Sequence, residues 1–224
     1  MSNHNLGDKA TQIRKDILNA SYEAGACHLG SALSCVDMLV ELFYKDIEKD
    51  ARFLFSKASG VATYYSILAD KGYFPKKKLA YYLKNHPLPS KEVPGVLHTF
   101  GSLGHGLSVA VGLALSDRRR KVYVLISDGE LEEGSTWEAL ISAVRLRLTN
   151  LVVMVDYNKI GASKEICMPF RQTFQALMLY ETERPVIKIY DTIKGKGVDF
   201  MENQICWHYR NLNEVSLKKA LAQL

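Results

Sequence analysis

A chain of 224 residues, 47% of them hydrophobic and 24% charged, is long enough to bury a substantial core, and a single α/β domain over residues 1–224 is expected. The net charge of +5 is spread over short basic patches without interleaved aromatic residues, which argues against a nucleic-acid groove. We expect neither a membrane span nor a signal peptide. The four cysteines, Cys167 among them, show no CxxC spacing, so we expect reduced thiols in a cytoplasmic protein.

The first half of the chain has apolar residues at helical spacing, with one short strand-like run, RFLFS, at 52–56. Helices are predicted over residues 9–25, 35–45, 60–73, 76–87 and 104–115. Proline and glycine are frequent over residues 84–101, which predicts a structured loop, because an apolar helix begins directly after it.

Lysines such as Lys194, near the other end of the chain, are expected to be solvent-exposed, although a cation there would favour an anionic sugar.

The centre of the chain predicts a βαβ unit. The runs VYVLIS at 122–127 and NLVVMVD at 150–156 are rich in β-branched residues, and apolar residues recur at helical spacing between them. Because these strands are apolar on both faces, they predict a mainly parallel sheet with helices on each side, a three-layer α/β/α fold. Further on, FQALMLYETERPVIKIYDT predicts one short helix and one strand.

Acidic and amide residues follow the two central strands. Asp128 ends the first strand, and Asp156 and Asn158 end the second. Ligands of such sheets bind at the carboxyl ends of the strands, so these oxygens are expected at one rim. Carboxylate, amide and backbone carbonyl oxygens can supply part of a Mg²⁺ shell, with phosphate oxygens supplying the rest. Taken alone, Asp128-Gly129 equally predicts a turn or a helix start.

A glycine-rich stretch, HTFGSLGHGLSVAVG, covers residues 98–112. Glycines let the backbone approach a ligand, and the following helix presents unpaired amides to an anion or a polar ring. The same spacing fits equally well a helix that packs closely on the sheet.

Four segments carry a resemblance to a known family: GSLGHGLSVAVG, SDGELEEGSTWEA, VDYNKI and TIKGKGVDFMEN, in this order. With them the chain resembles the N-terminal, diphosphate-binding half of transketolase, and more closely the separate N-terminal subunits of two-component transketolases, over most of residues 10–224. The family's GDG metal motif and its later asparagine correspond to Ser127-Asp128-Gly129 and Asn158, with serine in place of the first glycine. The resemblance implies a thiamine diphosphate-binding fold, shortened near the C-terminus by a peripheral strand and helix.

The resemblance also implies ligands. Asp128, the Asn158 side chain and the Ile160 backbone carbonyl would hold Mg²⁺, or Ca²⁺ or Mn²⁺ in its place, and the metal would hold the diphosphate of thiamine diphosphate. Further cofactor contacts are implied for Gly101, Ser102, Leu103, Ser59, Gly129, Glu130 and Asp156. Glu133 matches the family glutamate that couples paired active sites.

Three histidines, His28, His86 and His208, match family positions that face the sugar, and the resemblance implies catalytic roles for them and for Glu133. Each histidine alone predicts a loop or capping residue. Proton transfer at sugar oxygens near neutral pH suits histidine. The family has a further histidine where this chain has Ser59, and a serine cannot shuttle a proton near neutral pH.

No segment of the chain matches the family's pyrimidine-binding domain, whose glutamate activates the cofactor. The resemblance therefore implies a partner, a C-terminal pyrimidine-binding transketolase subunit, in an α2β2 assembly. The implied reaction moves a two-carbon ketol unit from a ketose or ketose phosphate to an aldose or aldose phosphate.

Other functions stay open at this point. The missing histidine also fits another thiamine diphosphate-dependent enzyme, such as a synthase or decarboxylase subunit. The altered GDG motif and the shortened C-terminal part also fit a non-catalytic regulatory or scaffold homologue. Nucleotide binding on a Rossmann-type domain is disfavoured, because the glycine-rich loop follows no clear first strand.

Overall fold

The computed structural model describes residues 3–166, 170–178 and 182–224, and the chain divides into two compact units. The helical unit comprises Met1–Ile47, Ser59–Thr99 and Thr192–Leu224, and the sheet unit comprises Glu48–Ala58 and Phe100–Asp191. Each unit therefore combines segments that are far apart in the sequence. The single domain expected over residues 1–224 stays a prediction.

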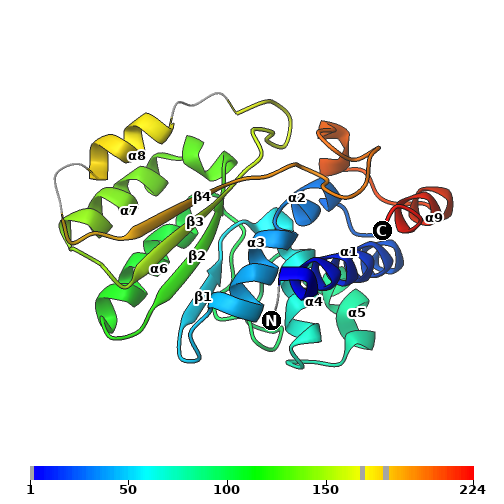
Figure 1. The fold of residues 1–224 in the computed structure, drawn as a ribbon, viewed down its shortest axis with the longest axis horizontal. Helices are drawn as coiled ribbons and strands as arrows, with labels where there is room; N and C mark the ends of the chain where they lie inside the picture. Colours follow the sequence, from blue (N-terminus) through cyan, green and yellow to red (C-terminus); the bar gives the residue numbers. More distant parts are fainter. Residues whose placement is uncertain (1–2, 167–169, 179–181) are drawn as a thin grey trace. The chain divides into compact units, whose positions relative to one another are not determined.

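The sheet unit contains a parallel sheet of four strands in the order β1-β2-β3-β4 (Figure 1). The strands are β1 (Arg52–Phe55), β2 (Val122–Ser127), β3 (Leu151–Tyr157) and β4 (Val186–Asp191). Every residue of β2 is buried, as its uninterrupted apolar sequence predicts. Ser127 pairs with Asp156, so the carboxyl ends of β2 and β3 are level and the residues that follow them share one rim.

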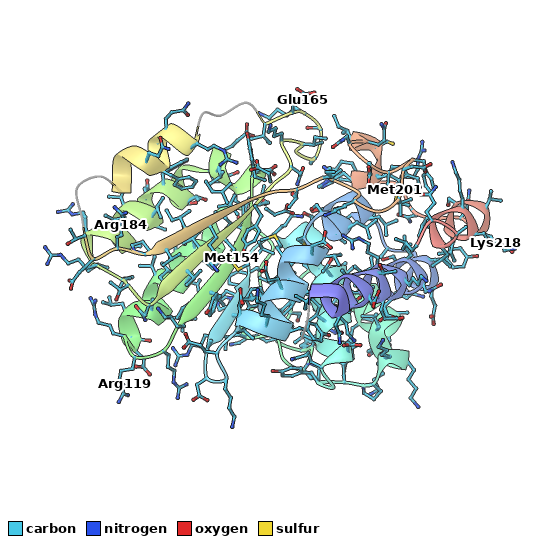
Figure 2. All side chains as sticks on the ribbon, in the orientation of Figure 1. Arg119, Met154, Glu165, Arg184, Met201 and Lys218 are labelled. Atoms are coloured by element: carbon cyan, nitrogen blue, oxygen red, sulfur yellow. The ribbon has the colours of Figure 1, made fainter. Side chains whose placement is uncertain are left out.

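The helices of the sheet unit are α6 (His105–Ser116), α7 (Gly134–Arg145) and α8 (Phe170–Met178). Leu107 and Ala110 of α6 and Leu140 of α7 are buried in one apolar core with alternate residues of β2 and β3. Met154 lies within the sheet, whereas the side chain of Arg119, before β2, is 93% exposed (Figure 2). The predicted strands and the predicted helix after the glycine-rich loop are confirmed.

Strand β4 forms the edge of the sheet, and its residues are exposed or half-buried. Between residue 163 and the TIKGKG segment at 192–197, the described part of the chain contains one short helix, α8, and one strand, β4, as the sequence predicts. Cys167 and residues 179–181 of the predicted helix lie outside the described residues. Cys27, Cys35 and Cys206 are free thiols.

The helical unit contains short helices around one long one. Its elements are α1 (Asn3–Ala24), α2 (Leu29–Ser34), α3 (Val36–Glu41), a π-helical turn (Leu42–Asp46), α4 (Val61–Asp70), α5 (Leu79–Asn85), 3₁₀ turns at Lys76–Lys78 and Ile205–His208, and α9 (Glu214–Leu221). The helix predicted over 35–45 is confirmed in position, but it is α-helical only as far as Glu41 and continues as the π-helical turn from Leu42. Helices α2 and α9 are not predicted by the sequence analysis.

Lys194 corrects a further expectation, because it is only 2% exposed rather than solvated. None of the helices in the described part of the chain has the length and apolar character that crossing a membrane requires.

Candidate active site

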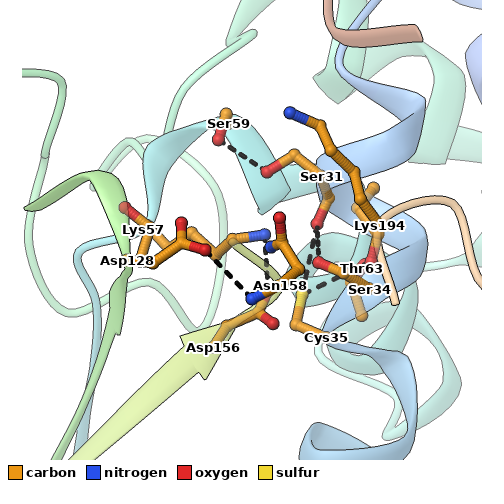
Figure 3. Close-up of polar contacts among 12 residues, drawn as sticks. Ser31, Ser34, Cys35, Lys57, Ser59, Thr63, Asp128, Asp156, Asn158 and Lys194 are labelled. Carbon is orange, nitrogen blue, oxygen red and sulfur yellow. Dashed lines mark hydrogen bonds and ion pairs between the residues drawn. The ribbon is translucent and has the colours of Figure 1, made fainter. Parts of the chain in front are cut away.

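Asp128 follows β2 at the carboxyl rim of the sheet and is 2% exposed (Figure 3). Its Oδ2 accepts hydrogen bonds from the backbone N–H groups of Asn158 and Lys159 at 2.9 and 2.7 Å. Its Oδ1 accepts one from the N–H of Gly129 at 2.9 Å. The backbone on both sides of the rim therefore fixes the direction of this carboxylate.

Asp156, inside β3, is fully buried and forms an ion pair with Lys57, whose Nζ lies 2.7 Å from its Oδ2. Burial raises the pKa of Asp128, and the charge of Asp156 raises it further, while the Lys57 ammonium opposes the rise. Two carboxylates are thus held close together in a buried rim with one cation between β1 and β3 to balance them.

The oxygens at the rim fit a hard divalent cation. Asp128 Oδ1 accepts one hydrogen bond and keeps a lone pair, and so does Asn158 Oδ1, which accepts from the N–H of Ile160 at 3.1 Å. Among the described residues, no three His, Cys, Asp or Glu side chains cluster to hold a metal ion. The predicted metal ligands differ from such a cluster, since they combine one carboxylate with an amide oxygen and the Ile160 backbone carbonyl.

Glu130 joins three segments of the sheet unit. It is fully buried, and it accepts hydrogen bonds from the Ser56 hydroxyl, from the Gly104 N–H at 3.3 Å and from the Ser127 N–H at 2.8 Å. Burial raises the pKa of Glu130, although these hydrogen bonds oppose the rise. The carboxylate braces the glycine-rich loop against β1 and β2, and its contact with the cofactor stays a prediction.

The glycine-rich loop exposes the residues that the sequence assigns to the cofactor. Gly101, Ser102 and Leu103 are exposed, and Leu103 keeps 45% of its surface accessible. Gly104 has φ of 80°, and a Cβ there would lie 2.5 Å from the Ser135 hydroxyl, so the position requires glycine. Exposed Glu133 lies beside Gly104, and its side chain makes no hydrogen bond or ion pair within the described residues.

His28 and His208 meet within the helical unit. Their ring centroids lie 4.8 Å apart in an edge-to-face arrangement, and the His28 N–H donates to the His208 carbonyl at 2.9 Å. His28 has φ of 66°, in the left-handed region that is costly for a residue with a Cβ. Such strain is common at functional sites and is consistent with the role assigned to His28.

Ser59 lies at the edge of a small cavity in the helical unit. Its hydroxyl is 2.7 Å from that of buried Ser31 (Figure 3). The cavity, of about 150 Å³, is lined by Ser59, Cys27, His28 and Lys84 together with apolar residues. Burial raises the pKa of the Cys27 thiol, so the pocket presents a neutral thiol and the Ser59 hydroxyl beside His28.

His86 follows the last residue of α5 and makes contacts other than those of the His28–His208 pair. Its ring packs against Tyr82, with centroids 6.2 Å apart, and its Nε2 is 3.8 Å from a carboxylate oxygen of Glu92. The structure therefore brings two of the three predicted histidines into contact and gives the third other neighbours. All three roles stay predictions.

Two residues of these sites were not assigned by the sequence analysis. Lys57 balances Asp156, and the signal for it was a lysine that directly follows an apolar strand. Ser31 pairs with Ser59, but no pattern in the sequence distinguishes it from an ordinary helix serine.

A parallel sheet with oxygen ligands at its carboxyl rim is typical of α/β proteins that bind a phosphorylated cofactor. The family model described as transketolase, thiamine diphosphate binding domain, matches residues 8–181. The chain belongs to the transketolase family, through this domain, and the resemblance seen in the sequence is confirmed.

Two relatives match the chain over nearly their whole length. An apulose-4-phosphate transketolase subunit of Actinobacillus succinogenes is 34% identical over 100% of this chain and 97% of its own. The 6-deoxy-6-sulfo-D-fructose transketolase subunit SqwG of Clostridium sp. is 32% identical over 98% of this chain and 96% of its own.

Solved structures establish the fold. The transketolase of Leishmania mexicana superimposes with a TM-score of 0.89 at 22% identity, covering 100% of this chain and 41% of its own. The predicted three-layer α/β/α, thiamine diphosphate-binding fold is thereby confirmed. The chain spans less than half the length of that single-chain transketolase.

Proposed function

We propose that this chain is the diphosphate- and metal-binding subunit of a two-component transketolase. The observation that supports this most directly is the rim where Asp128 and Asn158 each keep an oxygen lone pair on a family-matched domain. The relatives that match from end to end are transketolase subunits in their own right, which supports a separate partner chain for this one.

In this proposal the sheet unit holds the cofactor. Asp128, Asn158 and the Ile160 carbonyl bind Mg²⁺, and the exposed loop residues Gly101–Leu103 contact thiamine diphosphate. When bound, thiamine diphosphate supplies the carbanion chemistry that breaks and forms the carbon–carbon bond. The ion pair with Lys57 orients the Asp156 carboxylate within the rim.

In the same proposal, residues of the helical unit contact the sugar substrate. His28 and His208 hold and move protons at sugar hydroxyl and carbonyl oxygens, a task that histidine performs near neutral pH. His86 is proposed to contact the sugar as well. Ser59, which is proposed to contact the cofactor, supplies a hydroxyl where the family has a histidine, so it can donate a hydrogen bond but does not move a proton.

The proposed partner is a C-terminal, pyrimidine-binding subunit in an α2β2 assembly in the cytoplasm. The names of the two relatives specify substrates with a phosphate or a sulfo group, apulose-4-phosphate and 6-deoxy-6-sulfo-D-fructose. We therefore propose an anionic ketose as the two-carbon donor and an aldose as the acceptor.

A reconstituted assay tests this function. The chain is mixed with its partner subunit, Mg²⁺ and thiamine diphosphate, and transfer of a two-carbon unit from a panel of ketose phosphates and sulfonates to aldoses is followed by mass spectrometry. The wild type is expected to transfer the unit, and Asp128→Ala is expected to abolish cofactor binding and transfer. Asp117→Ala, in the turn before β2 of the same unit, where Asp117 pairs with Arg119 and Arg120, is the matched control. Retained tight cofactor binding in Asp128→Ala would sink the metal assignment.

The serine at position 59, where the family has a histidine, motivates one second candidate, a thiamine diphosphate-dependent synthase that takes its donor carbons from a 2-oxo acid. Such a reaction releases carbon dioxide, whereas ketol transfer does not. Release of ¹³CO₂ from 1-¹³C-pyruvate by the assembled enzyme separates the two reactions.

A further inference from the structure

A lysine is buried against one of the candidate catalytic histidines. Lys194 is 2% exposed, although lysine is among the residues least often buried. Its Nζ lies 3.4 Å from Nδ1 of His208, within the helical unit. A buried ammonium this close to an imidazole nitrogen determines which nitrogen carries the ring proton.

The backbone and a glycine hold this lysine in place. The Lys194 carbonyl accepts from the Asn203 N–H at 2.9 Å, and the next residue, Gly195, donates to the Gly30 carbonyl of α2 at 2.9 Å. The aliphatic part of the lysine runs across Gly30, where a Cβ would lie 3.2 Å from Cγ and 3.4 Å from Cε. Because Gly30 has no side chain, the stem can pass over α2 and bring its ammonium to His208.

The hydrogen-bonding chemistry of the ammonium and the imidazole then determines the tautomer of the His208 ring. An ammonium group has three hydrogen-bond donors and no acceptor, so the nitrogen that faces it must be an acceptor. An N–H at Nδ1 would point at the ammonium and be repelled. We infer that Lys194 is a positioning residue that holds His208 in its neutral form with the proton on Nε2.

The other groups around the ring are compatible with this state. His28 lies edge-to-face at 4.8 Å between centroids, and Tyr209 lies at the same separation on the His208 ring. The carbonyl of His208 is occupied by the His28 N–H, which holds the two histidines together through the backbone.

The consequence for catalysis rests on the proposed function. A neutral His208 with its proton on Nε2 can donate that proton to a sugar oxygen at neutral pH without first being protonated. Lys194 thus acts through His208 rather than on the substrate itself.

The test is a long-range ¹H–¹⁵N correlation spectrum of the full chain labelled at histidine, recorded at pH 7.5, with His208→Gln used for assignment. In the wild type, Nδ1 of His208 is expected at the shift of an unprotonated nitrogen and Nε2 at that of a protonated one. In Lys194→Met an Nδ1–H population is expected to appear. Gly30→Ala, which displaces the lysine stem, is expected to change the two shifts in the same direction by a smaller amount.

The matched control is Lys196→Met. Lys196 lies two residues away in the same segment, and its Nζ pairs with Asp37 at 2.6 Å. This change is expected to leave the His208 spectrum as in the wild type. In the assembled enzyme, Lys194→Met is expected to lower kcat by about tenfold or less, since losing a proton-transfer group outright costs about 100-fold or more.

A wild-type spectrum with the proton on Nδ1, or with both nitrogens protonated, overturns the inference whether or not any variant folds. An unchanged His208 spectrum in folded Lys194→Met overturns it too. The spectrum is recorded without substrate or partner, so a failure of ketol transfer in the reconstituted assay leaves the tautomer result standing and is told apart from it.

Discussion

Two buried acids at the rim of the sheet unit and one paired acid of the helical unit have pKa values displaced in opposite directions. In the sheet unit, burial raises the pKa of Asp128 and of Glu130. In the helical unit, burial alone would raise the pKa of Asp37, but hydrogen bonds and charges from Arg14 and Lys196 lower it below its ordinary value. Buried acids with raised pKa values are typical of functional sites. Surface acids whose pKa values are lowered by ion pairs more often stabilise the fold.

The largest expected effect tests the buried ion pair of the rim. Lys57→Met removes the cation that balances buried Asp156 and should lower the free energy of unfolding by about 3–5 kcal/mol, measured by urea denaturation. Lys164→Met is the control, since its pair with Glu132 is exposed and should contribute about 1 kcal/mol or less. Equal losses in the two variants would contradict the distinction between the rim and the surface.

A smaller effect concerns the close fit between α6 and β1. A Cβ at Gly106 would lie 2.1 Å from the Ser56 hydroxyl, so Gly106→Ala should destabilise the protein by about 1–3 kcal/mol. Gly112, in the same helix, has open space, so Gly112→Ala should stabilise it by up to about 1 kcal/mol. Thermal unfolding of the two variants tests this. A stabilised Gly106→Ala would show that α6 and the end of β1 are not tightly packed.

The raised pKa of Glu130 predicts a pH dependence of stability. Because the folded-state pKa lies above the ordinary 4.5, the wild type should lose stability as the pH rises above about 4.5 and through the folded pKa. Glu130→Gln cannot titrate, and its amide would face a backbone N–H, which costs about 1–3 kcal/mol. The difference between wild type and variant should therefore narrow as the pH rises from 4 to 8. A constant difference in chemical denaturation would mean that Glu130 has an ordinary pKa.

The smallest expected effect is the contribution of Asp37, in the helical unit, to the pH dependence of stability. This contribution has the opposite sign to that of Glu130. The lowered pKa of Asp37 means that its stabilising contribution is present above about pH 4 and is lost as the pH falls through the folded pKa. The Asp37 side chain is 43% exposed, so the contribution is about 1 kcal/mol or less. Asp37→Asn should flatten the acid limb of the stability profile between pH 5 and 3. An unchanged acid limb would mean that ion pairing does not lower the pKa of Asp37 in the folded protein.

The rim was largely predictable from the sequence, because strand ends are visible in it. Apolar runs mark β2 and β3, and polar residues directly after them must share a rim in a parallel sheet. Strand ends alone therefore place Asp128 beside Asn158, and the hydrogen bond between them agrees with that placement.

The helical unit was less predictable, because its key contacts depend on tertiary neighbours. Helix α2 starts at His28 in a left-handed conformation, which has no signal in hydrophobic periodicity. Lys194 is buried by segments distant in the chain, whereas composition predicts an exposed lysine, and Lys57 of the sheet unit departs from that expectation in the same way. Helix α9 was missed because its start depends on a capping box between Asn213 and Ser216 in a polar stretch.

The central claim is that this chain is one half of a split transketolase, and native mass spectrometry tests it most directly. The tagged chain is purified gently from its own host with Mg²⁺ present, and the intact assembly is weighed. We expect a heteromer with a second polypeptide, in equal numbers of copies, carrying bound thiamine diphosphate. A homo-oligomer that stays empty even with added cofactor would contradict the account and favour a non-catalytic homologue.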